Sequence, residues 1–252
     1  MRRSKFGLFV GLLFVSLSSS AYAGQIARYE AEGNANDMVG THNGSLVNGA
    51  GYGSGVFGQA FSLSANNQQY VTVPDDSAWT LGSNDFSLSL WVNFTSISPL
   101  GVGSLPNTFI GHDQGGGSAP KWIFGYNALG SMYFHINGSG GSTFLTSGST
   151  LAPTTNSWHL YTMTRSGSNY KFYFDGAIIG SDTSSLQIED AAAPLTIGQA
   201  EGIGYLDGRV DDVRVYDNAL TSTEVRALVP EPSTIITAGV GVAILLRRRK
   251  RS

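Results

Sequence analysis

A strict two-residue alternation of apolar and polar side chains between Phe86 and Phe94 constrains the fold more than any other feature of the sequence. The stretch reads FSLSLWVNF, and successive side chains of a strand point to opposite faces. A helix would instead scatter these apolar side chains around its axis. The pattern predicts a strand with one face in a core, and the core set is Phe86, Leu88, Leu90, Val92 and Phe94.

Further short apolar runs are separated by Gly, Asn, Asp, Ser and Pro, which is typical of antiparallel sandwiches. The predicted strands are YVTVP, KWIFGYN, SMYFHIN and WHLYTMTR. YKFYFDGAIIG predicts a hairpin, because Asp175-Gly176 suits the positive φ angles of a type I′ turn. The Gly-rich segments 113–120 and 137–150 hold few apolar side chains. They are predicted to be long surface loops.

A helix is predicted near the end of the folded body, in ALTSTEVRAL. Thr221 suits its N-cap, and Glu224 suits the reciprocal bond of a capping box. The preceding segment GYLDGRVDDVRVYDNAL predicts a strand. A regular pleat would place Asp211, Val213 and Val215 on one face of that strand.

The first 23 residues carry the features of a secretory signal peptide. Basic residues come first, an apolar stretch follows, and Ala21-Tyr22-Ala23 forms an A-x-A cleavage site. Cleavage after Ala23 would begin the mature chain at residue 24. A retained N-terminal membrane helix is the alternative, but the apolar stretch is short for one.

Residues 229–252 form a second targeting segment. Pro230, Glu231 and Pro232 come first, followed by an apolar stretch at 233–246 and a basic tail at 247–251. A stable span needs about 20 apolar residues, so this stretch is short. The segment resembles the PEP-CTERM sorting signal. The resemblance implies recognition and processing by an exosortase, export, and at least transient membrane attachment in the cell envelope. An ordinary tail anchor is the alternative.

Charge narrows the range of partners for the exported body. Seven basic and 18 acidic residues lie between residues 24 and 232, a difference of −11. Nucleic acids and anionic membrane surfaces need a basic face, so neither is an expected partner. Neutral glycans and divalent cations remain compatible. The sequence has no cysteine, which excludes disulfides and thiolate chemistry.

Residues 24–228 resemble a LamG-like domain with the concanavalin A-like jelly roll. The resemblance rests on ARYEAEGNANDMVGTHNGSLVNGAGYGSGVFGQAFSLSANNQQYVTVPD at the start, DFSLSLWVNF within, and LDGRVDDVRVYDNALTSTEVRAL at the end. It implies an all-β fold of two packed antiparallel sheets with a short C-terminal helix, in which the first and last strands are neighbours. Such folds serve lectins, carbohydrate-binding and adhesion domains, and some hydrolases.

The sequence favours binding over catalysis. The E-x-D-x-x-E arrangement of laminarinase-type glycosidases is absent. The four histidines are widely spaced, lack a metal-binding pattern, and are expected on the surface or in loops. We therefore predict a non-enzymatic protein that binds polysaccharide or a matrix protein. A carbohydrate-active enzyme and a purely structural matrix protein are the alternatives.

A calcium ion is the predicted cofactor, because Ca²⁺ takes six to eight oxygen ligands from loops rich in Asn and Asp. The neighbouring first and last strands would bring two groups of oxygens together. The alternative is that these side chains make turn hydrogen bonds or ion pairs. The predicted ligands are Asn34, Asn36, Asp37, Asp211 and Asp212.

Glycan contacts are predicted at Trp91, Asn93 and Tyr133. Trp91 and Asn93 lie opposite the core face of their strand, and Tyr133 alternates with apolar neighbours in the same way. An exposed aromatic ring can stack on a sugar while short polar side chains bind its hydroxyl groups. The alternative for Trp91 is a second small core beneath other parts of the chain.

Overall fold

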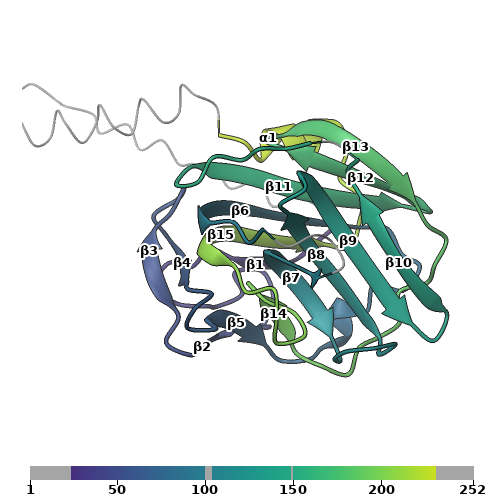
Figure 1. Cartoon of the computed structure of the whole chain (residues 1–252), viewed down its shortest axis with the longest axis horizontal. Coiled ribbons are helices and arrows are strands. Elements are labelled where there is room, and N and C mark those ends of the chain that lie inside the picture. The colour runs from purple at the N-terminus through teal and green to yellow at the C-terminus, as the bar shows by residue number, and fades with distance from the viewer. Residues whose placement is uncertain (1–23, 100–103, 149, 231–252) are drawn as a thin grey trace, which may run out of the picture.

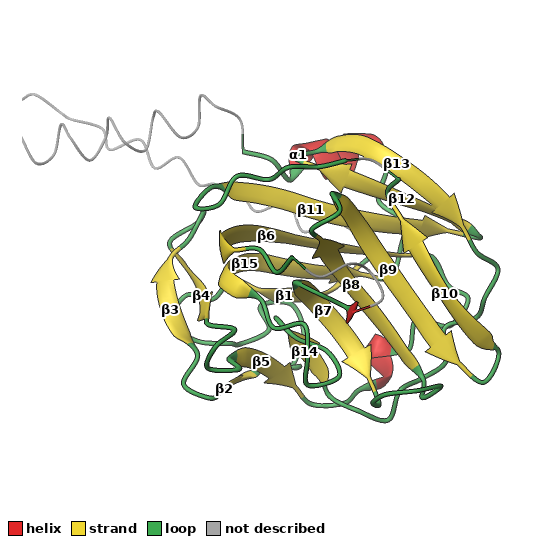
Figure 2. Ribbon diagram, viewed as in Figure 1, coloured by secondary structure: helices red, strands yellow, loops and turns green. Residues whose placement is uncertain are grey.

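The computed structural model describes residues 24–99, 104–148 and 150–230. The predicted signal peptide at 1–23 and most of the predicted sorting segment, residues 231–252, lie outside the described residues. The described chain folds into two antiparallel sheets packed face to face (Figures 1 and 2). The predicted all-β sandwich is therefore confirmed.

One sheet has eight strands in the order β13-β12-β11-β6-β15-β4-β3, with β1 also paired to β15. The first and last strands are thus neighbours, as expected. The strands are β1 (Gln25–Tyr29), β3 (Gly51–Ser54), β4 (Gln59–Leu63), β6 (Phe86–Ser96), β11 (Trp158–Ser166), β12 (Asn169–Phe174), β13 (Ala177–Thr183) and β15 (Asp207–Tyr216).

The other sheet has seven strands in the order β10-β9-β8-β7-β14-β5-β2. In Figure 1, β7 to β10 run obliquely across the strands of the eight-stranded sheet. The strands are β2 (Ser45–Val47), β5 (Tyr70–Val73), β7 (Thr108–Asp113), β8 (Lys121–Asn127), β9 (Ser131–Gly138), β10 (Gly141–Thr146) and β14 (Leu195–Ile197).

The apolar face of β6 lies in the main core, as its alternation predicts. All five core residues from Phe86 to Phe94 are at most 1% exposed. Aromatic rings join the sheets: Phe86 packs on Phe134 at 5.7 Å, and Phe94 on Phe109 at 6.1 Å between centroids. Burial of such rings is a main source of folding free energy.

Two local predictions are confirmed in detail. The α-helix α1 (Ser222–Ala227) has Thr221 as N-cap, and the reciprocal bonds with Glu224 form a capping box. The β12–β13 turn has φ angles of 49° at Asp175 and 77° at Gly176. A further short 3₁₀ helix, η1 (Ser77–Trp79), follows β5. Figure 2 shows α1 at one edge of the sandwich beside β12 and β13.

Two predictions about strands are wrong. Residues 137–150 do not form one long loop, because β9 and β10 pair as a hairpin from Gly138 and Gly141. Leu145 is the one fully buried side chain of β10, which lies at a sheet edge, so this strand needs few apolar residues. In β15, a β-bulge between Asp211 and Arg214 breaks the regular pleat. Val213 therefore joins the core without Asp211.

None of the helices in the described ranges combines the length and the apolar character that crossing a membrane requires.

Candidate functional site

Trp91 does not offer a ring to a ligand. It lies on the outer face of the eight-stranded sheet, but only 6% of it is exposed. It packs in a second core with Leu160 and Tyr173, and Val225 of α1 and Leu228 at the helix C-cap belong to the same core. The alternative reading of Trp91, a second small core, is the one the structure shows.

Asn93 and Tyr133 are also buried, at 4% and 0% exposure. Asn93 lies on the same face of β6 as Trp91, between Trp158 and Arg209 on the neighbouring strands. Tyr133 lies under Leu105 and Ala200, and its hydroxyl donates to the Pro106 carbonyl at 3.1 Å. The predicted contacts are thus corrected: in this structure all three side chains are packed within the fold.

The outer face of the seven-stranded sheet offers a different site. One row of residues crosses every strand of this sheet, and in register it reads Phe144, His135, Ile123, Gly111, Thr196, Thr72 and Ser45. The middle of the row is closed, because Ile123 is fully buried and clusters with Leu105 and Ala200. At the β10 end of the row, the Phe144 side chain is exposed to solvent.

At that end, four residues form what we call the aromatic platform: Phe144 and Ser142 from β10, and His135 and Asn137 from β9. The rings of Phe144 and His135 stack with centroids 3.9 Å apart and planes within 10°. His135 occupies one face of the Phe144 ring, and Phe144 remains 36% exposed. Ser142 Oγ lies 3.3 Å from His135 Nε2. The platform therefore combines a fixed, exposed ring with polar neighbours.

His135 is uncharged at neutral pH. Burial and the nearby positive charge of Lys121 lower the pKa of its imidazole to about 4. Both causes disfavour the protonated ring. The platform thus presents a neutral aromatic pair instead of a cation.

Lys121 itself is held in an ion-pair cluster beside the platform. Only 1% of it is exposed, and its Nζ donates to Glu201 and to the Gly115 carbonyl. Asp113 Oδ1 lies 3.7 Å from the same Nζ, and both Asp113 oxygens accept backbone N–H groups, from Gly115 and Glu201. Asp113 and Glu201 therefore neutralise a buried lysine and fix a loop, as buried charges require.

The predicted calcium ligands near the N-terminus are engaged by the protein. Asp37 Oδ1 accepts the N–H groups of Arg28 and Val39, both at 3.0 Å, and Oδ2 lies 2.9 Å from His42 Nδ1. These bonds lower the pKa of Asp37 against the opposing effect of burial, which is the largest single influence. Asn34 Oδ1 accepts the N–H of Asn36 in a turn.

The two C-terminal aspartates are engaged as well. Asp212 lies between Arg28 and Arg214, at 2.7 and 2.6 Å. Asp211 Oδ2 accepts the N–H groups of Val56 and Phe57 at 2.8 and 3.0 Å. Its Oδ1 is buried without a hydrogen-bond partner among the described residues. One free oxygen falls far short of a calcium shell.

Across the described residues, no three His, Cys, Asp or Glu side chains gather as a metal site requires. The five predicted residues do not fit a calcium ion in this arrangement, because hydrogen bonds from backbone N–H groups and ion pairs occupy all but one of their carboxylate oxygens.

Sequence reasoning missed Phe144 and His135. Phe144 lies in the segment predicted to be a loop, and His135 was expected on the surface although it is 6% exposed. His112, likewise expected there, is fully buried. A usable signal was present: Phe144 is the only aromatic residue in 137–150, and it lies in the run Thr143–Thr146, whose aromatic, β-branched and apolar side chains are of the kind enriched in strands.

Comparison with known proteins agrees with this architecture. Residues 65–226 match the concanavalin A-like lectin/glucanases superfamily. The chain belongs to this superfamily. Residues 228–251 match the PEP-CTERM protein-sorting motif, which indicates export and membrane-associated processing at the cell envelope and implies recognition by an exosortase. A search of curated proteins gave no match.

Several solved structures share the superfamily fold. One is domain 4 of AbnA, a GH43 extracellular arabinanase from Geobacillus stearothermophilus, in complex with arabinotriose: TM-score 0.68, 18% identity, covering 82% of this chain and 98% of that one. The binding domain of Paraclostridial Mosquitocidal Protein 1 gives a TM-score of 0.60 and 17% identity, covering 82% and 52%. The Botulinum neurotoxin serotype G binding domain gives 0.61 and 15%, covering 81% and 50%. The chain thus spans about half of each toxin domain, and identities this low carry the fold alone.

Proposed function

We propose that the protein is an exported, non-enzymatic binding protein of the bacterial envelope or its exopolysaccharide matrix, and that it binds a neutral polysaccharide on the aromatic platform. The observation that carries this proposal is the exposed Phe144 ring, fixed by stacking at 3.9 Å on a buried His135. A sugar can lay its apolar face on such a ring.

The surroundings of the ring support a glycan. Ser142 is exposed beside it, and Asn137 lies directly across from Ser142 on β9. The Asn137 amide is held by the backbone, since Nδ2 donates to the Gly117 carbonyl and Oδ1 accepts the Gly138 N–H. The exposed Ser142 hydroxyl is therefore the polar group that would orient a ligand, while the apolar ring supplies contact area. Because His135 is neutral, the platform has no charge of its own to select an anionic sugar.

The arrangement of carboxylates favours binding over hydrolysis. Glycosidases need one protonated carboxylic acid and a second free carboxylate flanking the scissile bond. The two carboxylates nearest the platform's lysine neighbour, Asp113 and Glu201, are committed to Lys121 and to backbone groups. The arabinotriose bound to the AbnA domain motivates arabinan as one probe for this chain.

A glycan array probed with the purified protein tests the proposal. Phe144→Ala is expected to weaken binding to the strongest neutral glycan about three- to tenfold, the equivalent of about 0.7–1.4 kcal/mol of lost aromatic contact. Ile178→Ala is the matched control, because Ile178 is 54% exposed on β13.

Two outcomes would contradict the proposal. Shortened oligosaccharides after incubation would establish the alternative of a carbohydrate-active enzyme. A blank array, together with retention of the protein in the biofilm matrix, would support a structural matrix protein or a protein partner instead.

A further inference from the structure

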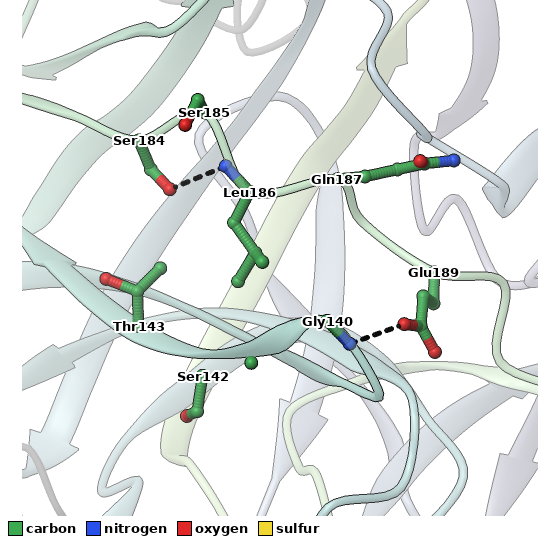
Figure 3. Close-up of a pocket in the computed structure, with 9 residues that line it drawn as sticks. Gly140, Ser142, Thr143, Ser184, Ser185, Leu186, Gln187 and Glu189 are labelled. Carbon is green, nitrogen blue, oxygen red and sulfur yellow. Dashed lines mark hydrogen bonds between the residues drawn. The ribbon is translucent and has the colours of Figure 1, made fainter.

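A pocket of about 520 Å³ lies at the edge of the seven-stranded sheet, next to the aromatic platform (Figure 3). One wall is the β9–β10 turn and the start of β10, and the other is the segment 184–189 that follows β13. Among the described strands, β10 is the last one hydrogen-bonded into its sheet, and the Asp182 carboxylate of β13 accepts the Thr146 N–H of β10 at 3.1 Å. The volume falls within the roughly 300–1,000 Å³ of small-molecule sites.

The lining suits a ligand rich in hydroxyl groups. Ser142, Thr143, Ser184 and Ser185 contribute hydroxyls, and Leu186 is the one large apolar side chain among the lining residues. Figure 3 shows Leu186 directed from its segment toward β10. The lining includes one carboxylate and no cationic side chain. Such a lining disfavours anionic sugars and accepts neutral ones.

Glu189 is fixed at one end of this pocket. Its Oε1 accepts hydrogen bonds from Ser139 Oγ at 2.6 Å and from the Gly140 N–H at 3.0 Å. These bonds lower the pKa of Glu189, which is therefore ionised at neutral pH. A side chain at Gly138 would bring its Cβ within 2.7 Å of the Glu189 carboxyl carbon. Glycine at position 138 therefore leaves room for the Glu189 carboxylate beside the end of β9.

Ser142 connects the pocket to the platform. It lines the pocket and also lies 3.3 Å from the His135 ring that supports Phe144. A ligand on Phe144 needs to cross only β10 to enter the pocket, and neighbouring strands lie about 4.8 Å apart. The two sites are therefore close enough for one oligosaccharide.

We infer that the pocket is a second subsite for a neutral polysaccharide, whose chain continues from Phe144 over the edge of β10 and against Leu186. This inference rests on the proposed function. It adds that the ligand is a polymer held over several sugar residues, and that uronic acid polymers are excluded.

Isothermal titration of the full-length protein with oligosaccharides of two to six sugars tests the inference. The probes are neutral arabino-, gluco-, xylo- and manno-oligosaccharides, with oligogalacturonates as the anionic series. For the neutral series that binds, affinity is expected to rise at least about tenfold with length, which is about 1.4 kcal/mol. Oligogalacturonates are expected to bind at least about tenfold more weakly than neutral probes of equal length.

Two variants locate the added affinity. Ser185→Trp, at an exposed position of the lining, should cut hexasaccharide affinity to the disaccharide value and leave disaccharide binding unchanged. Ser54→Trp, at an exposed position of β3 in the other sheet, is the control and should change neither.

The outcomes separate the two proposals. Equal affinities for all lengths, or hexasaccharide binding unaffected by Ser185→Trp, would overturn the subsite and leave the platform standing, provided Phe144→Ala still weakens binding. Tighter binding of oligogalacturonates would overturn the neutral specificity. No binding by any probe would overturn both proposals. A peptide ligand at this edge would show itself as loss of peptide but not of sugar binding in Ser185→Trp, which also contradicts the inference.

Discussion

Asp211 is a carboxyl group whose surroundings oppose its ionisation. Burial raises its pKa to about 7 from an ordinary value of 3.8, although the Val56 and Phe57 N–H groups oppose this rise. It is fully buried, and Oδ1 lacks a hydrogen-bond partner within the described ranges. Because the folded-state pKa lies above the unfolded one, the folded protein binds more protons between these values. The contribution of Asp211 to stability therefore falls as the pH rises from about 4 to about 7.

Asp211→Asn should remove this dependence. The free energy of unfolding of the variant minus that of the wild type is expected to increase by roughly 1–4 kcal/mol between pH 4 and pH 7. Urea unfolding at a series of pH values measures it. A difference that stays constant across this range would show that Asp211 is ionised in the folded protein at low pH.

The contribution of His135 to stability should change with pH in the opposite direction. Its folded-state pKa of about 4 lies below the ordinary 6.5, so the folded protein binds fewer protons than the unfolded chain between these values. The contribution of His135 to the free energy of unfolding is complete above about pH 6.5 and is lost as the pH falls toward 4. The free energy of unfolding of His135→Gln minus that of the wild type is therefore expected to decrease by roughly 1–3 kcal/mol from pH 4 to pH 6.5. The same urea series tests this, and an increase would contradict the neutral histidine under Phe144.

At the scale of elements, α1 acts as a cover for the outer face of the eight-stranded sheet. Its Val225 and the C-cap residue Leu228 pack with Trp91 in the second core. Trp91→Phe should therefore lower the free energy of unfolding by about 1–3 kcal/mol, because it leaves a partly filled space. Glycan affinity should change by less than about twofold, since the ring does not reach the platform. Loss of binding with unchanged stability would restore Trp91 as a ligand contact.

The elements also show where sequence reasoning was sufficient. The alternation in β6 and the capping box at Thr221 depend on neighbours in the sequence, and both were predicted correctly. β10 was missed because an edge strand faces solvent and tolerates glycine and serine. Asp211 was predicted on the same face as Val213, which is wrong, because a single bulge moves every later side chain of β15 to the other face. No local sequence pattern predicts that bulge.

For the whole molecule, too, local sequence patterns predict the fold but not the candidate site. Two packed sheets could be predicted because apolar and polar residues alternate along the strand sequences. The platform could not, because it depends on how β9 and β10 pair and on which loops cover the rest of the outer face. Tyr133 and His135 are two residues apart on β9. Leu105 and Ala200 cover Tyr133, while the His135 ring stacks on the exposed Phe144.

The stability of the whole molecule is also expected not to depend on calcium binding at the predicted ligands. A site on folded protein would raise stability by about 4 kcal/mol at a thousandfold excess of ion over the dissociation constant. Because Asp37 and Asp212 are already bonded to protein groups, the melting temperature should be the same in millimolar calcium and in chelator. Heat of binding together with a higher melting temperature in calcium would contradict this, and Asp211→Asn would test whether its free oxygen is a ligand.

Binding of a neutral glycan to the outer face of the seven-stranded sheet at Phe144 can be located by amide hydrogen exchange, measured with and without the strongest oligosaccharide from the array. Exchange is expected to slow in β9 and β10 and to stay unchanged in β6 and α1. Protection over residues 86–94 and α1, with β9 and β10 unaffected, would contradict it.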